Sequence, residues 1–396
     1  MLTTVLTSTD AGGRAGGAER RRNLALVLQR VHAAPATRSE LTRVSGLNRS
    51  TVGALVADLA ARGLVIEDEP TAGGQVGRPS PVVRAGERPV AVAIHPEVDA
   101  VTVALVRLGG EVIAVERSPF AAAPSVDEAV DAAAGGLRRL LAREPSRHPI
   151  GAGLAIPGVV TADGILRLAP HLGWRDVPIA ARFAEVLHLP VAAANDGTLG
   201  ARAEAQFGAG RGVDDLVYLN GGASGIGGGI VAGGVPLTGA AGHAGEFGHT
   251  ILGAPGGADT LGVRGTFESA VSRAALLRVL RLDDAEPDRF EAALIAATDP
   301  AVAAEVAAQV DVLATAIANA VTVLNPARVI LGGFLSALAA VSGQLLDSLV
   351  ADRALPGIGE RVEIRRSELG SRIMLIGAAE LAFVPLLTDP ATYQPA

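Results

Sequence analysis

Residues 37–63, TRSELTRVSGLNRSTVGALVADLAARG, carry the spacing of two short helices separated by a tight break. Thr37 and Glu40 match a capping box, which predicts that the first helix begins at this point. Ser45-Gly46 interrupts the pattern, and Asn48 is placed to cap the second helix. The apolar stripe of that helix consists of Val52, Leu55, Val56 and Leu59. The stretch therefore predicts a helix-turn-helix.

The flanking segments extend this unit to a winged helix-turn-helix. Upstream, apolar residues recur at helical spacing and predict a preceding helix that contains Leu24, Val27, Leu28 and Val31. Downstream, the apolar runs 64–66 and 81–83 enclose a glycine-rich segment and predict a β-hairpin. The tip of this hairpin includes Gly77-Arg78-Pro79.

The second helix of the quoted stretch opens with polar side chains that lie off its apolar stripe. In a winged helix-turn-helix this turn faces base edges in the major groove, while the preceding helix contacts phosphates. An arginine in the wing is favoured in a narrow minor groove. We therefore expect DNA contacts from Arg38, Ser39, Asn48, Arg49, Ser50, Thr51 and Arg78. The alternative, a protein-interaction or dimerisation module built from the same elements, stays open.

The composition excludes several classes of protein. A chain of 396 residues has room for two or three domains, and 49% hydrophobic with 19% charged residues excludes a disordered chain. The absence of cysteine excludes disulfides, a thiolate nucleophile and cysteine-ligated zinc. Residues 1–17 lack a basic start followed by an apolar run, so we expect no signal peptide. The sequence has no uninterrupted apolar run of about 18 residues, so we expect a cytoplasmic protein without a membrane span.

Charge is distributed unevenly along the chain. Residues 1–88 contain 12 arginines and 8 acidic residues, whereas residues 89–396 contain 22 arginines and 33 acidic residues. There is no lysine. A basic N-terminal segment on an acidic body suggests that one end of the protein meets a polyanion.

The body, residues 89–396, alternates short apolar runs with segments of helical spacing. Expected helices include 127–143, 267–280, 288–297, 301–324 and 373–387. This alternation in two halves predicts an α/β protein with two lobes around a cleft. We expect a DNA-binding domain over 1–88 and a body over 89–396. Within the body, one lobe spans roughly 89–195 with the C-terminal helix, and the other spans roughly 196–330.

Six segments of the body appear in the order found in a known family. They are Gly153-Leu-Ala-Ile-Pro-Gly158, Ala169-Pro-His-Leu-Gly-Trp174, Ala194-Asn-Asp196, Ser224-Gly-Ile-Gly-Gly-Gly229, Gly245-Glu-Phe-Gly-His249, and Leu324-Asn-Pro326 with Leu331-Gly-Gly333. The body thereby resembles the ROK family of repressors, open reading frames and sugar kinases. The resemblance implies a two-lobed actin-like, ribonuclease-H-like domain behind the winged helix-turn-helix, as in the family's repressors.

The resemblance also implies a sugar site. Asp196 occupies the position of the general base in the family's kinases, where a carboxylate accepts hydrogen bonds from sugar hydroxyls. The other implied sugar contacts are Asn195, Glu246, His249 and Glu268. His171 departs from the asparagine usual in this motif. Taken alone, the pair Asn195-Asp196 has a structural alternative, which is a strand-end turn or a helix N-cap.

The phosphate-binding motif departs from the family pattern. Family kinases open the body with Asp-x-Gly-Gly-Thr, which helps to hold Mg²⁺ and the phosphates. This chain has Ala93-Ile-His-Pro-Glu97, which lacks the carboxylate, places a proline without an N–H, and adds a negative charge. We therefore expect no phosphoryl transfer, with an active ROK sugar kinase that carries a DNA-binding module as the alternative.

The zinc motif of the family is also replaced. Its three cysteines correspond to Asp259, Leu261 and Thr266, which cannot complete a tetrahedral site with His249. The spacing His243-x-x-Glu246-x-x-His249 is not that of a His-Glu-x-x-His helix. We expect no metal and no cofactor, with Leu261, Val263 and Phe267 anchoring the loop by packing.

Together these features predict a sugar-responsive transcriptional regulator, most simply a repressor. Its partners would be a palindromic operator in double-stranded DNA and a sugar or sugar-phosphate effector. A homodimer or homotetramer is expected, because a single helix-turn-helix gives little contact with DNA. The sequence leaves open which sugar binds, whether it is phosphorylated, and whether the regulator represses or activates.

Overall fold

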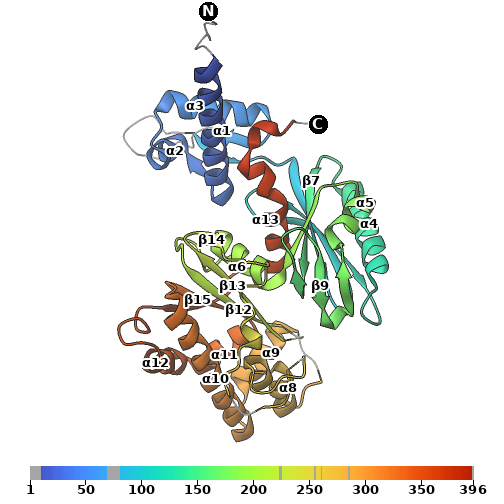
Figure 1. Cartoon of the computed structure of the whole chain (residues 1–396), viewed down its shortest axis with the longest axis vertical. Coiled ribbons are helices and arrows are strands. Elements are labelled where there is room, and N and C mark those ends of the chain that lie inside the picture. Colours follow the sequence, from blue (N-terminus) through green and yellow to red (C-terminus); the bar gives the residue numbers. More distant parts are fainter. Residues whose placement is uncertain are drawn as a thin grey trace, which may run out of the picture.

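The computed structural model describes residues 10–68, 81–222, 225–253, 256–259, 261–283 and 286–394 (Figure 1). The side chains of residues 10–16 are not part of this description. Arg78, the arginine expected in the wing, lies outside the described residues.

The N-terminal domain is a winged helix-turn-helix, as predicted. Helices α1 (Asp10–Ala33), α2 (Arg38–Ser45) and α3 (Arg49–Ala61) pack on a small sheet of order β1-β3-β2. Its strands are β1 (Ala36–Thr37), β2 (Val65–Asp68) and β3 (Val82–Ala85). Both expected caps are present: Thr37 and Glu40 form a reciprocal capping box, and Asn48 Oδ1 accepts the Thr51 N–H at 2.8 Å.

The first lobe of the body is a five-stranded sheet of order β11-β7-β4-β5-β6. Its strands are β4 (Pro89–Pro96), β5 (Ala100–Arg107), β6 (Val112–Pro119), β7 (His148–Ile156) and β11 (Val191–Asn195). Helices α4 (Val126–Arg143) and α5 (Ile179–Leu187) cover one face, and α13 (Ile373–Thr388) covers the other. Side chains alternate accordingly along β4: Val90 and Val92 face α4 and α5, and the smaller Ala91 and Ala93 face α13.

A smaller antiparallel sheet accompanies the first lobe. It contains β8 (Val159–Val160), β9 (Leu166–Ala169) and β10 (Trp174–Val177), with the short helix η1 (Pro170–Leu172) between β9 and β10.

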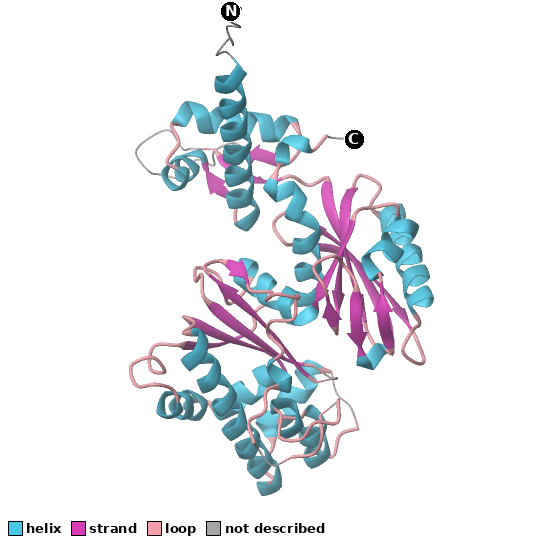
Figure 2. Ribbon diagram, in the orientation of Figure 1, coloured by secondary structure: helices cyan, strands magenta, loops and turns pink. Residues whose placement is uncertain are grey.

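The second lobe is a sheet of order β14-β13-β12-β15-β16. Its strands are β12 (Leu216–Gly221), β13 (Ile226–Ala232), β14 (Val235–Pro236), β15 (Arg328–Gly333) and β16 (Glu363–Arg366). Helix α6 (Asp196–Phe207) packs on one face. The remaining helices are α7 (Phe267–Ala270), α8 (Arg273–Leu280), α9 (Pro287–Ala296), α10 (Pro300–Leu324), α11 (Phe334–Ser342) and α12 (Gln344–Arg353). They gather on the opposite side of this sheet (Figure 2).

Two sequence-based expectations for this lobe need correction. The single helix expected over 267–280 is broken into α7 and α8, because Val271 turns into the core in an extended conformation. Helices α11 and α12 and strand β16 were not expected, and β16 carries the lobe's sheet beyond residue 330.

Helix α13 links the lobes to the N-terminal domain. It runs from between the two lobes to α1, and the C-terminal end of the chain lies beside the N-terminal domain (Figure 1). One continuous apolar cluster contains Leu24, Leu28 and Val31 of α1 together with Phe383 and Leu387 of α13. The N-terminal domain is therefore packed on the body rather than tethered by a loose linker.

Two apolar segments of the described chain, α10 and Gly370–Thr388, are long and apolar enough to cross a membrane. Both contribute buried residues to the cores described above, including Leu313 and Ile317 of α10 and Ile376 and Phe383 of α13. Their apolar character is thus used in packing against the sheets.

Candidate functional site

Close glycine contacts bring three segments of the body together. A Cβ atom on Gly197, at the start of α6, would lie 2.5 Å from the carbonyl oxygen of Gly228 in β13. A Cβ on Gly228 would lie 3.0 Å from the carbonyl oxygen of Gly245. Only glycine permits such an approach of backbones. These contacts place the start of α6, strand β13 and the turn after Gly245 side by side. The start of α6 carries Asp196, and the turn after Gly245 carries Glu246 and His249.

Asn195 and Asp196 connect β11 to α6. Asn195 is the N-cap of α6: its Oδ1 accepts the Thr198 N–H at 3.1 Å, and its Nδ2 donates to the Gly158 carbonyl at 3.1 Å. Asp196 Oδ1 accepts the Gly197 N–H at 2.8 Å. The helix-cap interpretation is therefore correct for Asn195. It is compatible with ligand binding, because the amide retains one N–H and one lone pair.

The carboxyl groups of Asp196 and Glu246 have raised pKa values. For Asp196 the main cause is burial, which outweighs the opposing effects of His95, the Gly197 N–H and His171. For Glu246 the main cause is again burial, aided by the negative charges of Asp196 and Glu268 and opposed by His249 and His243. These mutual effects show that the predicted sugar-site residues lie close together.

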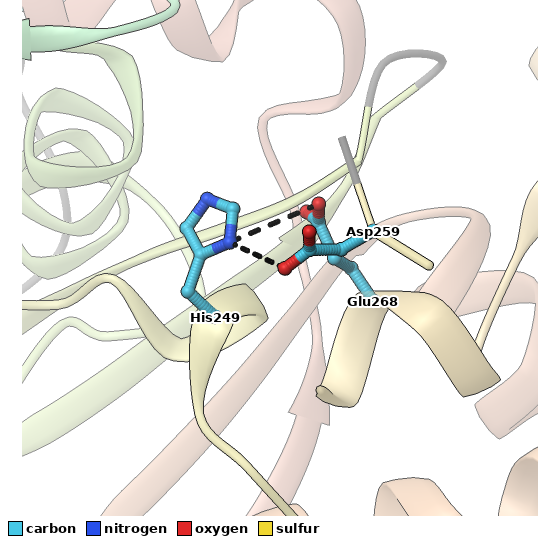
Figure 3. Close-up of side chains that lie close together, drawn as sticks. All are labelled: His249, Asp259 and Glu268. Atoms are coloured by element: carbon cyan, nitrogen blue, oxygen red, sulfur yellow. Dashed lines mark hydrogen bonds and ion pairs between the residues drawn. The ribbon is translucent and has the colours of Figure 1, made fainter. Parts of the chain in front are cut away.

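His249 and Glu268 lie beside Asp259 (Figure 3). His249, in the short helix η2 (Phe247–His249), has its Nδ1 3.1 Å from Asp259 Oδ2 and 3.9 Å from Glu268 Oε1. Glu268 on α7 accepts the Ile226 N–H at 3.2 Å, which ties it to the first residue of β13. The structure thus brings Asp196, Glu246, His249 and Glu268 into one neighbourhood, with Asn195 adjacent in sequence.

The predicted DNA-contacting residues of the described chain lie at the start of α2 (Arg38 and Ser39) and at the start of α3 (Asn48, Arg49, Ser50 and Thr51). Ser39, Asn48, Arg49 and Ser50 are exposed, and Thr51 is half-buried. The Ser50 hydroxyl donates to Asn48 Oδ1 at 2.7 Å, which links two of these side chains to each other.

Arg38 is paired with an acidic side chain of the same domain. Its Nη2 donates to Glu67 Oε2 at 2.6 Å, so its charge is balanced by the wing strand β2. Arg20, in the basic run 20–22, is paired similarly with Asp58 at 2.8 Å. The sequence did not reveal these partners, because both acids lie far along the chain from their arginines.

The sequence profile of the ROK family matches residues 92–384. The chain belongs to the ROK family. A xylose repressor from Caldicellulosiruptor bescii is 26% identical over 377 residues, which cover 89% of this chain and 93% of the repressor. A kanosamine kinase from Amycolatopsis mediterranei is 33% identical over 281 residues, which cover 68% of this chain and 88% of the kinase.

A solved structure shows the same fold over nearly the whole chain. It is a ROK family transcriptional regulator described as a homologue of the E. coli MLC protein. It covers 94% of this chain and 97% of its own, with a TM-score of 0.75 and 21% identity. The winged helix-turn-helix and the two-lobed ROK body therefore occur together in a known architecture.

The zinc motif implied by the ROK resemblance does not fit the residues at this position. His249, Asp259 and Glu268 each offer a ligand atom, and these atoms lie within 4.8 Å of one another. However, Asp259 Oδ1 already accepts the N–H groups of Leu261 and Val263, at 2.9 and 2.8 Å, and Oδ2 faces His249 directly. Leu261 has no donor atom and Thr266 has only a neutral hydroxyl, so the set lacks the thiolates of a closed ROK zinc site.

The expected packing of the loop is also partly wrong. Phe267 is buried, but Leu261 and Val263 are 52% and 42% exposed. The loop is held instead by the hydrogen bonds of Asp259, whose side chain is inaccessible to solvent.

The hairpin that replaces the ROK phosphate motif is closed on itself. Ala93 is buried in β4, and the Glu97 N–H donates to the Ala100 carbonyl at 2.7 Å. His95 Nδ1 lies 2.9 Å from the Ala155 carbonyl oxygen, and His95 also opposes the raised pKa of Asp196. His95 and His171 both lower the pKa of Asp196 and so belong to the candidate site. In the sequence they were recognised only as departures from the ROK family motifs.

Proposed function

We propose that this chain is a sugar-responsive transcriptional regulator of the cytoplasm, most simply a repressor. The protein would bind a palindromic operator as a homodimer or homotetramer. The DNA contacts of its N-terminal domain would come from Ser39, Asn48, Arg49, Ser50 and Thr51. Arg38 would contact the phosphate backbone, and Arg78 would contact DNA from the wing. Its effector would be a small sugar or sugar phosphate, as the full-length likeness to xylose repressors suggests. The effector would bind to Asn195, Asp196, Glu246, His249 and Glu268, and neither metal nor cofactor is required.

The observation that carries this proposal is the course of α6. The helix begins at Asp196, directly after Asn195, and ends at Phe207. The ring of Phe207 packs edge-on against His32 of α1, with ring centroids 5.3 Å apart. One short, rigid element thus joins the candidate sugar site to the DNA-binding domain.

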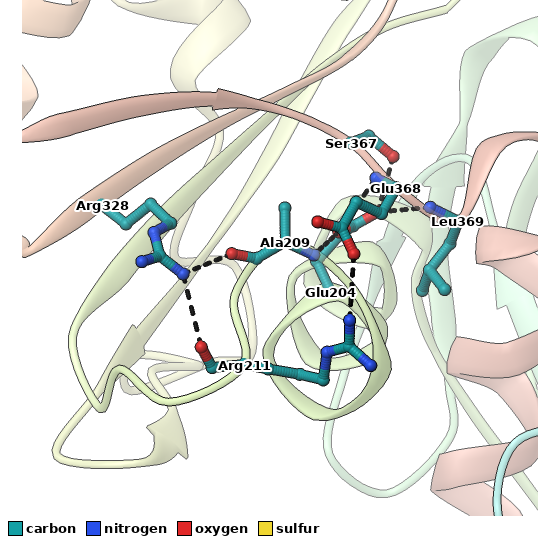
Figure 4. A network of polar contacts seen from close by, with 7 residues as sticks. All are labelled: Glu204, Ala209, Arg211, Arg328, Ser367, Glu368 and Leu369. Atoms are coloured by element: carbon teal, nitrogen blue, oxygen red, sulfur yellow. Dashed lines mark hydrogen bonds and ion pairs between the residues drawn. The ribbon is translucent and has the colours of Figure 1, made fainter.

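Helix α6 is fastened to α13, which also contacts the DNA-binding domain. A Cβ on Gly377 of α13 would lie 2.4 Å from the Leu199 carbonyl oxygen of α6, so the two backbones are in direct contact. The buried Glu204 of α6 accepts the N–H groups of Ala209 at 2.7 Å and Leu369 at 3.1 Å (Figure 4). Residue 369 lies in the segment that leads into α13. A displacement of α6 therefore acts on α13 as well.

The mechanism is thermodynamic linkage. A sugar that binds one arrangement of the lobes more tightly than another shifts the population by its difference in affinity. If the two arrangements place α1 differently, the two α3 helices of an oligomer no longer match half-sites about 34–36 Å apart. Operator and sugar then weaken each other's binding by the same factor.

A ligand screen tests the sugar half of this proposal. The full-length protein is heated with a panel of pentoses, hexoses and their phosphates, and a ligand of the native state raises the Tm. We expect one class of sugar to raise the Tm of wild type and to leave that of Asp196→Ala unchanged. A sugar that binds wild type must also change the retardation of operator DNA selected from a random library. Binding without any such change would contradict the proposal.

A ROK sugar kinase with a DNA-binding module is the second candidate. Asp196 is retained at the general-base position and has a raised pKa, and a kanosamine kinase matches much of the body. The closed β4–β5 hairpin, in which the Glu97 N–H is already used, argues against a phosphate site. A coupled assay for ADP release with each sugar of the panel separates the two. Turnover that Asp196→Ala abolishes would establish the kinase.

A further inference from the structure

The interaction between His249 and Asp259 occupies the position where the ROK resemblance implies a metal. Asp259 Oδ2 lies 3.1 Å from His249 Nδ1, and the Asp259 side chain is inaccessible to solvent. Burial alone would raise the pKa of Asp259, but the Val263 N–H and His249 hold it below its usual range. A buried aspartate that stays ionised beside an imidazole is a strong hydrogen-bond acceptor.

The other oxygen of Asp259 is committed to the backbone. Oδ1 accepts the N–H groups of Leu261 and Val263, and the Asp259 N–H donates to the Val263 carbonyl at 2.7 Å. The carboxylate therefore cannot rotate without breaking the turn that it closes. Asp259 Oδ2 therefore points toward the imidazole, and Glu268 lies on the same side of the ring (Figure 3).

We propose that Asp259 is a positioning residue that replaces a metal ion as the partner of His249 Nδ1. The carboxylate accepts a hydrogen bond from the Nδ1–H group of His249. This hydrogen bond holds His249 in the tautomer whose Nε2 is unprotonated. A metal ion bonded to Nδ1 would leave the proton on Nε2 instead. His249 therefore presents an acceptor on Nε2, suited to a hydroxyl donor. The part of this inference that concerns a sugar rests on the proposed function, whereas the tautomer does not.

Asp259→Asn gives a sharp test, because the structure predicts which way the introduced amide must face. The amide oxygen is required by the two backbone N–H groups of Leu261 and Val263, so the amide nitrogen faces His249 and donates to Nδ1. Nδ1 must then be an acceptor, and the proton must move to Nε2. The substitution should reverse the tautomer of His249 without changing the size of the side chain.

The experiment is long-range ¹H–¹⁵N NMR of the histidine rings at about pH 8, above the ordinary imidazole pKa of about 6.5. His249→Gln assigns the signal. We expect protonated Nδ1 in wild type and protonated Nε2 in Asp259→Asn. The same tautomer in both proteins, or a doubly protonated ring in wild type, would overturn the proposal.

Metal content provides a second measurement that needs no variant. Wild-type protein incubated with Zn²⁺ and desalted should retain no stoichiometric zinc, and a chelator should leave its Tm unchanged. Stoichiometric zinc whose removal lowers the Tm would overturn the proposal.

Asp259→Ala provides a third measurement. This variant should have a Tm roughly 2–4 °C below that of wild type, and its hydrogen exchange over 251–266 should be faster. None of these readouts depends on identifying the sugar, so failure here is distinct from failure of the proposed function.

Discussion

His32 of α1 and Glu380 of α13 form a buried hydrogen bond between the winged helix-turn-helix domain and the body. Nε2 of His32 lies 2.7 Å from Oε1 of Glu380, and the two side chains are 1% and 4% exposed. The Gly109 N–H donates to His32 Nδ1 at 3.0 Å, which leaves the ring proton on Nε2 to donate to Glu380. The other Glu380 oxygen lies 3.8 Å from Arg202 Nε on α6. Three helices thus meet at one polar contact inside an apolar core.

Loss of this contact should weaken the packing of the winged helix-turn-helix domain on the body. His32→Ala leaves the buried Glu380 without its donor and should lower the free energy of unfolding by roughly 1–3 kcal/mol. Glu380→Gln retains an acceptor oxygen for His32 and should cost less. Urea unfolding, followed by circular dichroism, measures both changes. Equal stability of His32→Ala and wild type would contradict the importance of this contact.

The start of α3 should determine DNA affinity. Arg49→Ala combined with Ser50→Ala removes two exposed polar side chains from the turn that we propose to face the bases, and should weaken operator binding by roughly 1–3 kcal/mol. Gel retardation measures the loss. Arg175 is also an exposed arginine but lies on the body, so Arg175→Ala is the control and should bind DNA as wild type does. If the double variant retains full affinity, the protein-interaction alternative gains support.

The raised pKa of Asp196 predicts that the ionised carboxylate, which would accept hydrogen bonds from a sugar, lowers the stability of the fold. Burial favours the protonated form, so the ionised carboxylate destabilises the folded state above its raised pKa. This cost disappears as the pH falls through the raised pKa toward the ordinary value of about 3.9. Asp196→Asn should therefore match or exceed the Tm of wild type at pH 7, and the difference should shrink as the pH approaches 4. A Tm well below wild type at pH 7 would contradict this assignment.

Two neighbouring glycines should respond differently to alanine. A Cβ on Gly228 would clash with the Tyr218 carbonyl oxygen at 2.9 Å and the Phe247 ring at 2.6 Å, so Gly228→Ala should lower the Tm strongly. Among the described residues, a Cβ on Gly227 meets only Asp196 Oδ1, at 4.0 Å. Gly227→Ala should therefore fold normally and reduce sugar affinity by adding a methyl group beside Asp196. Thermal unfolding and a sugar titration on both variants check this, and similar Tm values would refute it.

Local chemistry explains what could be predicted from the sequence. The caps at Thr37 and Asn48 depend on side chains within three residues, so the helix-turn-helix followed directly from the residues. The break at Val271 and the helices around Gly343 did not, because they depend on packing against distant strands.

The site was less accessible to sequence reasoning than the fold. The residues proposed to bind sugar were identified only through the ROK resemblance. The partners of Arg38 and His249 could not be predicted, because Glu67 and Asp259 reach them only through tertiary contacts.

Coupling between the sugar and DNA is measured most directly by operator affinity with and without the sugar found in the screen, in wild type and in His32→Ala. In wild type the sugar should change the operator Kd by about 5–150-fold, the usual range of coupling between two sites. In His32→Ala, sugar and operator should each still bind, but the sugar should no longer change the operator Kd. Unchanged coupling in this variant, or a bound sugar without effect in wild type, would contradict communication through α6, α13 and α1.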